Sequence, residues 1–286
     1  MRVTTRGGNI AIIDLRRQEG IPVSEPSGLR RRTNPVFDLS RKGRTRIHKL
    51  YDAGVTVVTC THRTKYLERI FENYWRQNYP RKELIIVINH DDIDIDEFRR
   101  GAASDATIQV YKLGGNTSLG ECYNFAVDKS QYSFIAKFDD DDYYAPQFLA
   151  DTMLAFQETQ ADIIGKTCRY VYFESNAALA LCGNGLESQT VPYVVGATMV
   201  FRKYIFDRVK FRSITSGEDS EFQSDCLAHG FRIYSIDRYN YVTIRHPDTE
   251  PHTFHFDDAP YLSQCQFITH THDFPALITK NRAFYV

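Results

Sequence analysis

Two apolar, β-branched runs separated by an amphipathic segment are the feature that most restricts how this chain can fold. Residues 55–59 and 84–88 are rich in Val and Ile, which is typical of buried strands. Between them, apolar residues at helical spacing predict a helix over 64–77, which Tyr79-Pro80 ends. A strand, a helix and a strand in this order predict a parallel pair joined by a right-handed crossover.

Predicted strands and helices continue to alternate along the chain, so we expect an α/β fold with a mostly parallel, Rossmann-like central sheet flanked by helices. Small and polar residues over 175–189 predict a surface excursion. Further strands are expected at 108–111, 132–136, 161–165, 169–173, 194–201, 231–235 and 241–244, and further helices at 121–128, 146–157, 204–209 and from 216 or 217 to 229.

Four consecutive carboxylates, Asp139–Asp142, follow the strand predicted at 132–136. In open α/β sheets ligands bind at the carboxyl ends of the strands. Adjacent carboxylates repel one another, so a cation is their natural partner. Oxygen ligands suit Mg²⁺ or Mn²⁺, which are usually held by one or two carboxylates and substrate phosphates. A metal-chelated phosphate compound is therefore one candidate ligand. A solvated acidic turn and a weak Ca²⁺ site remain alternatives at this point.

Three further segments contain candidate catalytic or ligand-binding residues. Glu218-Asp219 opens a predicted helix, where the helix dipole favours carboxylates; one of them would also be placed to act as a general base. The glycine-containing segment 114–120 precedes a helix and would make a phosphate cradle, although it lacks the Lys-Ser/Thr of a P-loop. His246 lies just past the strand predicted at 241–244.

Composition and charge narrow the class of protein. The 286 residues are 42% hydrophobic and 25% charged, which is ordinary for a globular chain, and no apolar run is long enough to span a membrane. The first residues lack the apolar core of a secretory signal, so we expect a cytoplasmic protein. Six widely separated cysteines include no C-x-x-C pair, and most are expected to be reduced thiols in the core.

Charge also divides the chain. Residues 1–50 contain twelve Lys or Arg against four Asp or Glu, a net +8, so the remainder carries −9. We predict a basic N-terminal extension at 1–50, a main domain at 51–247, and an aromatic and His-rich C-terminal extension at 248–286. Aromatic residues that stack on bases are nearly absent from 1–50, so packing of this arm on the acidic body is favoured and no nucleic-acid partner is expected.

Over roughly residues 53–247, the order of these parts resembles the family 2 glycosyltransferases of the GT-A fold. The first loop of this chain lacks the Pro of that family, and the second lacks its Gly-Ser. The motifs that carry the resemblance are Cys60-Thr61-His62-Arg63, Asn89-His90-Asp91-Asp92, Gly120-Glu121-Cys122-Tyr123-Asn124, Asp139-Asp140-Asp141-Asp142 with Pro146, and Glu218-Asp219.

The resemblance implies a metal-dependent, inverting transfer of a sugar from a nucleotide-sugar, most often a UDP-sugar, to an acceptor hydroxyl. By the same resemblance, the site divides into three groups of residues. Thr61, Arg63 and Asp91 would line the base and ribose pocket, and Asn116, Gly120 and Asn124 would also bind the nucleotide-sugar. Asp139 and Asp140 would contact ribose or orient the metal shell, while Asp141, with His246, would bind Mn²⁺ or Mg²⁺. Asp219 would be the catalytic base, and Glu218 would position it or the acceptor.

Other functions remain open. A sugar-1-phosphate nucleotidyltransferase would carry a Gly-rich loop after the first strand, and residues 59–64 contain no glycine. A haloacid dehalogenase-type phosphatase would place Thr or Val where this chain has Tyr143. An inert nucleotide- or glycan-binding module on the same fold is a third alternative. The acceptor could be a glycan, a lipid-linked glycan, a protein or a small metabolite, and the C-terminal extension could form a homodimer contact.

Overall fold

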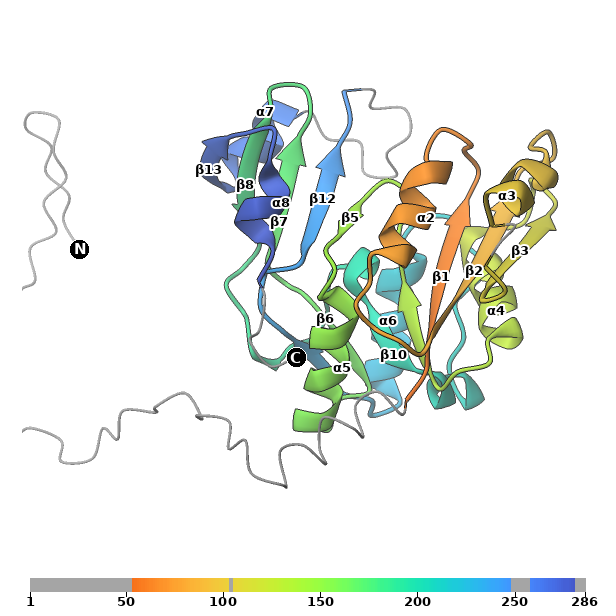
Figure 1. Cartoon of the computed structure of the whole chain (residues 1–286). Helices are drawn as coiled ribbons and strands as arrows, with labels where there is room; N and C mark the ends of the chain where they lie inside the picture. The colour runs from red at the N-terminus through yellow and green to blue at the C-terminus, as the bar shows by residue number, and fades with distance from the viewer. Residues whose placement is uncertain (1–52, 103–104, 248–257, 281–286) are drawn as a thin grey trace, which may run out of the picture. The chain divides into compact units, whose positions relative to one another are not determined.

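The computed structural model describes residues 53–102, 105–247 and 258–280, and it contains two sheets (Figure 1). The predicted extension at 1–50 lies outside these residues, as do His252 and His255. In spatial order, the larger sheet consists of β3 (Ile108–Leu113), β2 (Lys82–Asn89), β1 (Val55–Thr61), β4 (Phe134–Lys137), β10 (Val200–Arg202), β6 (Ile163–Gly165), β11 (Ile233–Ser235) and β9 (Gln189–Thr190).

Strands β3, β2, β1 and β4 of this sheet are mutually parallel, while β10 runs antiparallel to β4 and to β6. The predicted β-α-β unit is confirmed, because β1 and β2 pair in parallel from Val55 opposite Lys82 to Thr61 opposite Ile88. The helices of the larger sheet are α2 (Leu67–Trp75), α3 (Ile95–Ala102), α4 (Leu119–Lys129), α5 (Phe148–Glu158) and α6 (Glu218–Ala228).

Alternate residues of each central strand enter different cores, as the period of two in a strand requires. On β1, Val55 and Val57 join one cluster, and Val58 joins the other. The first cluster also contains apolar side chains of α2, α3 and α5, and the second contains those of α4 and α6. Helices therefore cover both faces of the sheet, which explains why its strands are continuously apolar instead of alternating.

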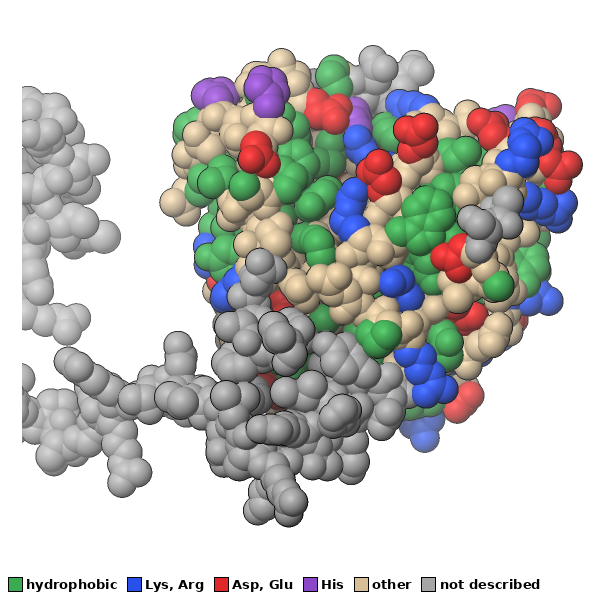
Figure 2. All heavy atoms as spheres, viewed as in Figure 1, with side chains coloured by type: hydrophobic (Ala, Val, Ile, Leu, Met, Phe, Trp, Pro, Cys, Tyr) green, Lys and Arg blue, Asp and Glu red, His purple; other side chains and the backbone are tan. Residues whose placement is uncertain are grey.

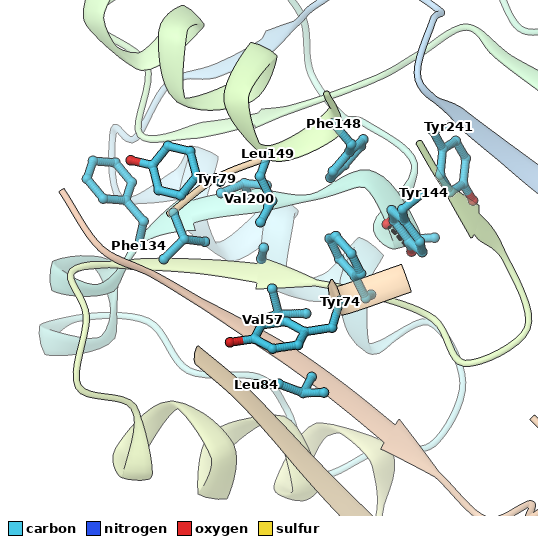
Figure 3. Close-up of a cluster of buried hydrophobic side chains, with 14 of the residues drawn as sticks. Val57, Tyr74, Tyr79, Leu84, Phe134, Tyr144, Phe148, Leu149, Val200 and Tyr241 are labelled. Carbon is cyan, nitrogen blue, oxygen red and sulfur yellow. Dashed lines mark hydrogen bonds between the residues drawn. The ribbon is translucent and has the colours of Figure 1, made fainter. Parts of the chain in front are cut away.

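Aromatic residues dominate the first cluster near the acidic tetrad (Figure 3). The rings of Phe138 and Tyr144 stack with centroids 3.7 Å apart, and Phe148 meets both rings edge-on. Tyr241 packs against Tyr144 with centroids 5.2 Å apart. All four side chains are buried. This packing fixes the two ends of the acidic loop, because Phe138 precedes the tetrad and Tyr144 follows it.

The smaller sheet carries the C-terminal part of the described chain. Its order is β13 (Gln266–His270), β8 (Ala178–Cys182), β7 (Arg169–Phe173), β12 (Tyr241–Arg245) and β5 (Tyr143–Tyr144), and two short helices accompany it, α7 (Asp258–Ser263) and α8 (Phe274–Ile278). Tyr261 and Leu262 of α7 pack on one face of this sheet, and Ile278 of α8 packs on the other. The domain boundaries predicted at 50 and 247 stay predictions.

A disulfide joins Cys182 to Cys265, so the expectation that most cysteines are reduced core thiols holds for the other four and not for this pair. In the register of β8 with β13, Gln266 lies opposite Leu181, which places Cys265 opposite Cys182. Their Cα atoms are 4.5 Å apart, within the range that a disulfide requires. Only strand pairing brings the two residues together, because 83 positions separate them in the chain.

Several predicted elements differ from the structure. The surface excursion predicted at 175–189 is wrong for β8, which pairs with β7 and β13 and is largely buried, while most of residues 183–189 are exposed as expected. The strand predicted at 194–201 is interrupted by the 3₁₀ turn η2 (Gly196–Thr198), and the helix predicted at 204–209 is the 3₁₀ turn η3 (Lys203–Asp207). Helix α3 was not predicted. Helix α4 begins two residues early, because Ser118 and Glu121 form a capping box.

No helix within residues 53–102, 105–247 and 258–280 is both long enough and apolar enough to cross a bilayer.

Candidate active site

The candidate site lies at one edge of the larger sheet, where the parallel strands β1 to β4 all end. The loops that follow them contain Thr61 to Arg63, residues 89–92, the glycine segment and the acidic tetrad. The sequence prediction that these segments share an edge is therefore confirmed. Acidic and basic side chains are interspersed over the end of the molecule toward which β1 and β2 point (Figures 1 and 2).

Asp140 is held by the first loop. Its carboxylate accepts hydrogen bonds from the Thr61 hydroxyl, at 2.5 Å, and from the Arg63 Nε, at 3.2 Å, and it forms an ion pair with Arg63 Nη2. Burial and the nearby Asp141 carboxylate raise the pKa of Asp140, and the Arg63 guanidinium opposes them. Thr61, Arg63 and Asp140, which the resemblance assigned to nucleotide-sugar binding, therefore lie in contact.

Asp141 lies among cations. One carboxylate oxygen is 3.1 Å from Arg63 Nη2, and its backbone carbonyl accepts a hydrogen bond from Arg69 Nη1 at 2.5 Å. Burial raises the pKa of Asp141, and Arg63 lowers it. Arg69 Nη1 is also 3.4 Å from His246 Nε2. Arg69 thus links Asp141 to His246, two residues that the sequence assigned to one metal site.

His246 is buried and pairs through Nδ1 with Glu174 Oε2 at 2.6 Å. Its ring packs on Tyr66, with centroids 5.0 Å apart, and the guanidinium of Arg63 lies 4.6 Å from the centroid of the same tyrosine ring. Burial lowers the pKa of His246, and Glu174 opposes this effect. A neutral imidazole whose Nδ1 donates to a carboxylate presents Nε2 as an acceptor, which is the form that binds a metal.

Asp142 differs from the three carboxylates before it, because its contacts are with the second sheet. Its carboxylate accepts hydrogen bonds from the Tyr241 hydroxyl and from the backbone N–H of Ile244 at 3.0 Å. The Asn73 side chain donates to its backbone carbonyl at 2.8 Å. Burial raises the pKa of Asp142 well above its usual value. Asp142 therefore anchors the acidic loop to β12 and α2.

A buried lysine joins the two acidic motifs. Lys137 Nζ is 2.7 Å from Asp139 Oδ1 and 4.0 Å from Glu218 Oε1, and its side chain is only 6% exposed. Burial raises the pKa of Glu218, Lys137 opposes this effect, and Asp219 adds to it. The net result is a pKa of about 7. The fold thus brings Glu218, from the first turn of α6, to the end of β4.

Asp219 is the more exposed of the two acidic residues of α6. Its Oδ1 accepts a hydrogen bond from the Ser220 N–H at 2.7 Å, and its Oδ2 lies over Gly196 in η2. A Cβ atom on Gly196 would be only 1.7 Å from that oxygen. Gly196 is therefore required for the position of the Asp219 carboxylate.

Gly196→Ala tests this contact. The added methyl must push the Asp219 carboxylate aside, so we expect a loss of catalytic rate of about 10²-fold, the cost of a misplacement of about 1 Å. Gly196 does not have a positive φ, so the backbone itself accepts alanine. The measurement is kcat together with the thermal unfolding midpoint. A folded Gly196→Ala variant with the wild-type kcat would show that the position of Asp219 does not matter for turnover.

Two other predicted residues lie on neighbouring loops of the same edge. Asp91 Oδ1 accepts a hydrogen bond from the Gly115 N–H at 2.9 Å, which joins the loop after β2 to the loop after β3. A Cβ atom on Gly114 would be 3.0 Å from Asn116 Oδ1. Asp91 and Asn116 are both exposed, and no described hydrogen bond or ion pair links either of them to the acidic tetrad. They stay predicted nucleotide contacts.

Gly120 and Asn124 occupy a packing contact beside the edge. A Cβ atom on Gly120 would lie 1.9 Å from the carbonyl oxygen of Arg212. The Asn124 amide donates to the Phe211 carbonyl at 2.8 Å and accepts from the Phe211 N–H at 3.0 Å. Both residues hold the segment before α6 against α4. They stay predicted nucleotide-sugar contacts, and their contacts in the fold are with this segment.

The donor set fits a divalent cation that a substrate would help to hold. No group of three or more His, Cys, Asp or Glu within the described ranges is arranged to bind a metal alone. Mg²⁺ and Mn²⁺ are commonly held by one or two carboxylates with water and substrate phosphates. Asp141, with the neutral imidazole of His246 nearby, suits such a site. Metal binding there would require the Arg63 and Arg69 side chains to move aside or to pair with the substrate phosphates.

Sequence reasoning missed four residues of this site: Lys137, Arg69, Tyr66 and Glu174. Lys137 had a signal, because it is a charged residue at the end of an apolar strand, directly before the tetrad. Arg69 and Tyr66 look like ordinary residues of a helix and its start. Glu174 follows β7, in the other sheet, and only the pairing of β7 with β12 brings it to His246.

Comparison with known proteins identifies the fold. S. aureus TarS 1–349, solved in complex with UDP-GlcNAc, superposes with a TM-score of 0.57 at 16% identity, over 68% of this chain and 59% of that one. The mannosyltransferase PcManGT from Pyrobaculum calidifontis, in complex with GDP-Man and Mn²⁺, has a TM-score of 0.52 at 15% identity, over 68% and 56%. At these identities the likeness shows the fold, and the predicted GT-A class is confirmed.

Sequence comparison identifies the family. The O-antigen biosynthesis glycosyltransferase WbnJ of Escherichia coli is 28% identical over 120 residues, which is 41% of this chain and 47% of that protein. The matched region therefore spans about half of that curated relative. The family model described as glycosyl transferase family 2 matches residues 56–209, from β1 through the tetrad and past β10. The chain belongs to glycosyl transferase family 2.

Proposed function

We propose that this chain is a metal-dependent inverting glycosyltransferase that moves a sugar from a nucleotide-sugar, with a UDP-sugar as the favoured donor, to an acceptor hydroxyl. One observation carries the proposal: Lys137 contacts Asp139 of the acidic tetrad and Glu218 of the second acidic motif. The two motifs lie 79 residues apart in the chain. Their meeting at one edge gives a donor side and an acceptor side to the same site.

The donor side consists of the loops after β1, β2 and β4. Thr61, Arg63 and Asp91 would line the base and ribose pocket, and Asp139 and Asp140 would contact ribose or orient the water shell of the metal. Asp141 and His246 would hold Mn²⁺ or Mg²⁺. A divalent cation in this place would neutralise charge that develops on the departing diphosphate. Arg63 and Arg69 lie within reach of the same phosphates, because both already contact Asp141.

The acceptor side consists of the first turn of α6. A sugar or alcohol hydroxyl has a very high pKa, so a carboxylate must take its proton as the oxygen attacks the anomeric carbon. Asp219 is assigned as this base because it is the more exposed carboxylate of the pair, and Glu218 would position it or the acceptor. Attack from the face opposite the diphosphate breaks the glycosidic bond as the new one forms, which inverts the anomeric configuration.

Calorimetric titration tests the donor class. UDP and GDP are titrated into the full chain with Mn²⁺ and with EDTA, and UDP-sugars are then assayed for hydrolysis and transfer. We expect one nucleotide to bind only with metal, and a transferred sugar with the inverted anomeric configuration. Binding without hydrolysis or transfer would favour the inert binding module. If neither nucleotide bound with metal present, the proposed donor site would be wrong.

Three further predictions concern the acceptor, a homodimer and the cellular location. Which acceptor is used, whether a homodimer forms and where the chain resides in the cell stay predictions. The predicted cytoplasmic location meets one opposing observation, because the disulfide between Cys182 and Cys265 is a kind of bond that is rare in reducing compartments.

A further inference from the structure

Lys137 contacts carboxylates from both halves of the proposed active site. We propose that Lys137 is a positioning residue that holds Asp139 on the donor side and Glu218 on the acceptor side at a fixed separation, and so aligns the catalytic base with the sugar donor. This inference rests on the proposed function and deepens it. Lys137 would act through the two carboxylates and not by touching a substrate.

Burial of the Lys137 ammonium group has a free-energy cost. A buried ammonium group is unfavourable unless carboxylates pair with it. Lys137 is 6% exposed, and its Nζ has a hydrogen-bonded partner in Asp139 at 2.7 Å and an ionic neighbour in Glu218 at 4.0 Å. The ring of Tyr123, with its centroid 5.1 Å from Nζ, lies against the same group.

Lys137 is also held in place by the backbone of β4. It is the last residue of β4, and its backbone N–H donates to the carbonyl of Met199 at 2.9 Å. Asp139, two residues on, is held separately, because its backbone N–H donates to the Tyr144 hydroxyl, which in turn donates to the carbonyl of Ala197. Ala197 follows Gly196, the residue under Asp219. The lysine and the turn beneath the base are thus fixed to one framework.

Lys137 also stabilises the charged form of Glu218. The groups that face Glu218 are Lys137 and Asp139 from the end of β4, Asp219 from α6, Cys60 from β1 and Tyr123 from α4. Lys137 is the cation in this set, and the other groups are acidic or neutral. With Lys137 in place, the pKa of Glu218 is about 7. Without it, desolvation and the two neighbouring carboxylates would raise that pKa further.

Lys137→Met tests the proposal, since methionine nearly keeps the length and removes the charge. The rate of sugar transfer or donor hydrolysis is measured from pH 5 to 10, and the Glu218 carboxyl is titrated by NMR. We expect kcat at neutral pH to fall by about 10–10²-fold with a smaller change in the donor KM, because alignment and not binding is lost. We expect the acid limb of kcat to move up by about 1–3 pH units, the effect of losing a neighbouring opposite charge.

Three control variants separate positioning from folding. Lys203→Met removes the charge of a lysine that directly follows β10, at the end of that strand away from Lys137. The Lys203 Nζ donates to the Ser130 carbonyl, and the variant should keep the wild-type pH profile of kcat. Lys137→Arg keeps the charge and should keep the acid limb near its wild-type pH. Lys137→Met/Glu218→Gln removes the unpaired buried carboxylate as well, so it should restore stability lost in Lys137→Met. If ionisation of Glu218 produces the acid limb that moves in Lys137→Met, the double variant should lack that limb.

The outcomes are distinguishable. An unchanged pH profile and an unchanged Glu218 titration in Lys137→Met would overturn the role of Lys137 while leaving the proposed function intact. A wild-type chain that neither transfers nor hydrolyses any nucleotide-sugar would overturn the proposed function, and with it the role of Lys137 in aligning the base.

Discussion

Asp219→Asn is expected to lower kcat for sugar transfer by about 10²–10⁴-fold, the range that loss of a general base produces. Asparagine has nearly the same shape, and its carbonyl oxygen can still accept the hydrogen bond from the Ser220 N–H. It cannot accept a proton from the acceptor hydroxyl. Donor binding should therefore stay within a few-fold of wild type. Single-turnover transfer and calorimetric titration of the nucleotide measure the two quantities separately.

Asp225→Asn is the matched control for this substitution. Asp225 lies on the same helix as Asp219, and its carboxylate pairs with Arg212, at 2.8 Å, outside the candidate site. This pair is partly exposed, so its loss should change stability by no more than about 1 kcal/mol. If Asp219→Asn and Asp225→Asn were equally active, Asp219 would not be the base, and Glu218 would be the next residue to test.

Asp141→Ala is expected to abolish metal-dependent nucleotide binding. The Asp141 carboxylate contacts Arg63, and its backbone carbonyl contacts Arg69, which also contacts His246, so the substitution removes the carboxylate predicted to bind the metal. Loss of an outer-shell partner alone typically weakens metal binding by 10–100-fold, and loss of a ligand should cost at least about this much. Titration of Mn²⁺, followed by electron paramagnetic resonance, and calorimetry with UDP measure this.

Asp142→Asn is the matched control one residue further on. Asp142 binds Tyr241 and Ile244 and anchors the loop, so its substitution should lower the thermal midpoint while the folded protein still binds Mn²⁺ and nucleotide. Equal loss of metal binding in both variants would indicate that folding of the loop, and not the Asp141 carboxylate, controls the site. Full metal-dependent binding by Asp141→Ala would remove the main support for the donor site.

The strand and helix pattern was predictable because the physical signal is local. The β-branched runs of β1 and β2 are buried on both faces, and their apolar character marks them in the sequence regardless of the partner strand. Since β1 and β4 run parallel, the loop with Thr61 and Arg63 had to end beside the acidic tetrad. Pairing of β1 with β4 brings the two loops together, and the structure shows that Asp140, of the four carboxylates, contacts both residues.

The misses share a different cause. Residues 175–189 contain small residues, glycines and polar groups, and β8 becomes a buried strand only because β7 and β13 pair with it. The 3₁₀ turn at Gly196 has no local signal that outweighs the apolar run around it. Its glycine leaves room for Asp219, which is 23 positions away in the chain. The disulfide likewise depends on a strand register and not on the spacing of its cysteines.

The sequence by itself determined the fold class, the family and the sheet edge that carries the site, because strand periodicity and short motifs are properties of neighbouring residues. Tertiary structure alone decided how the acidic residues divide their roles. Asp139 to Asp142 are four identical side chains in a row, yet one contacts Lys137, two contact Arg63 and the last binds β12. A carboxylate takes its pKa and its partners from groups that surround it in space, and those groups come from five separate elements of the chain.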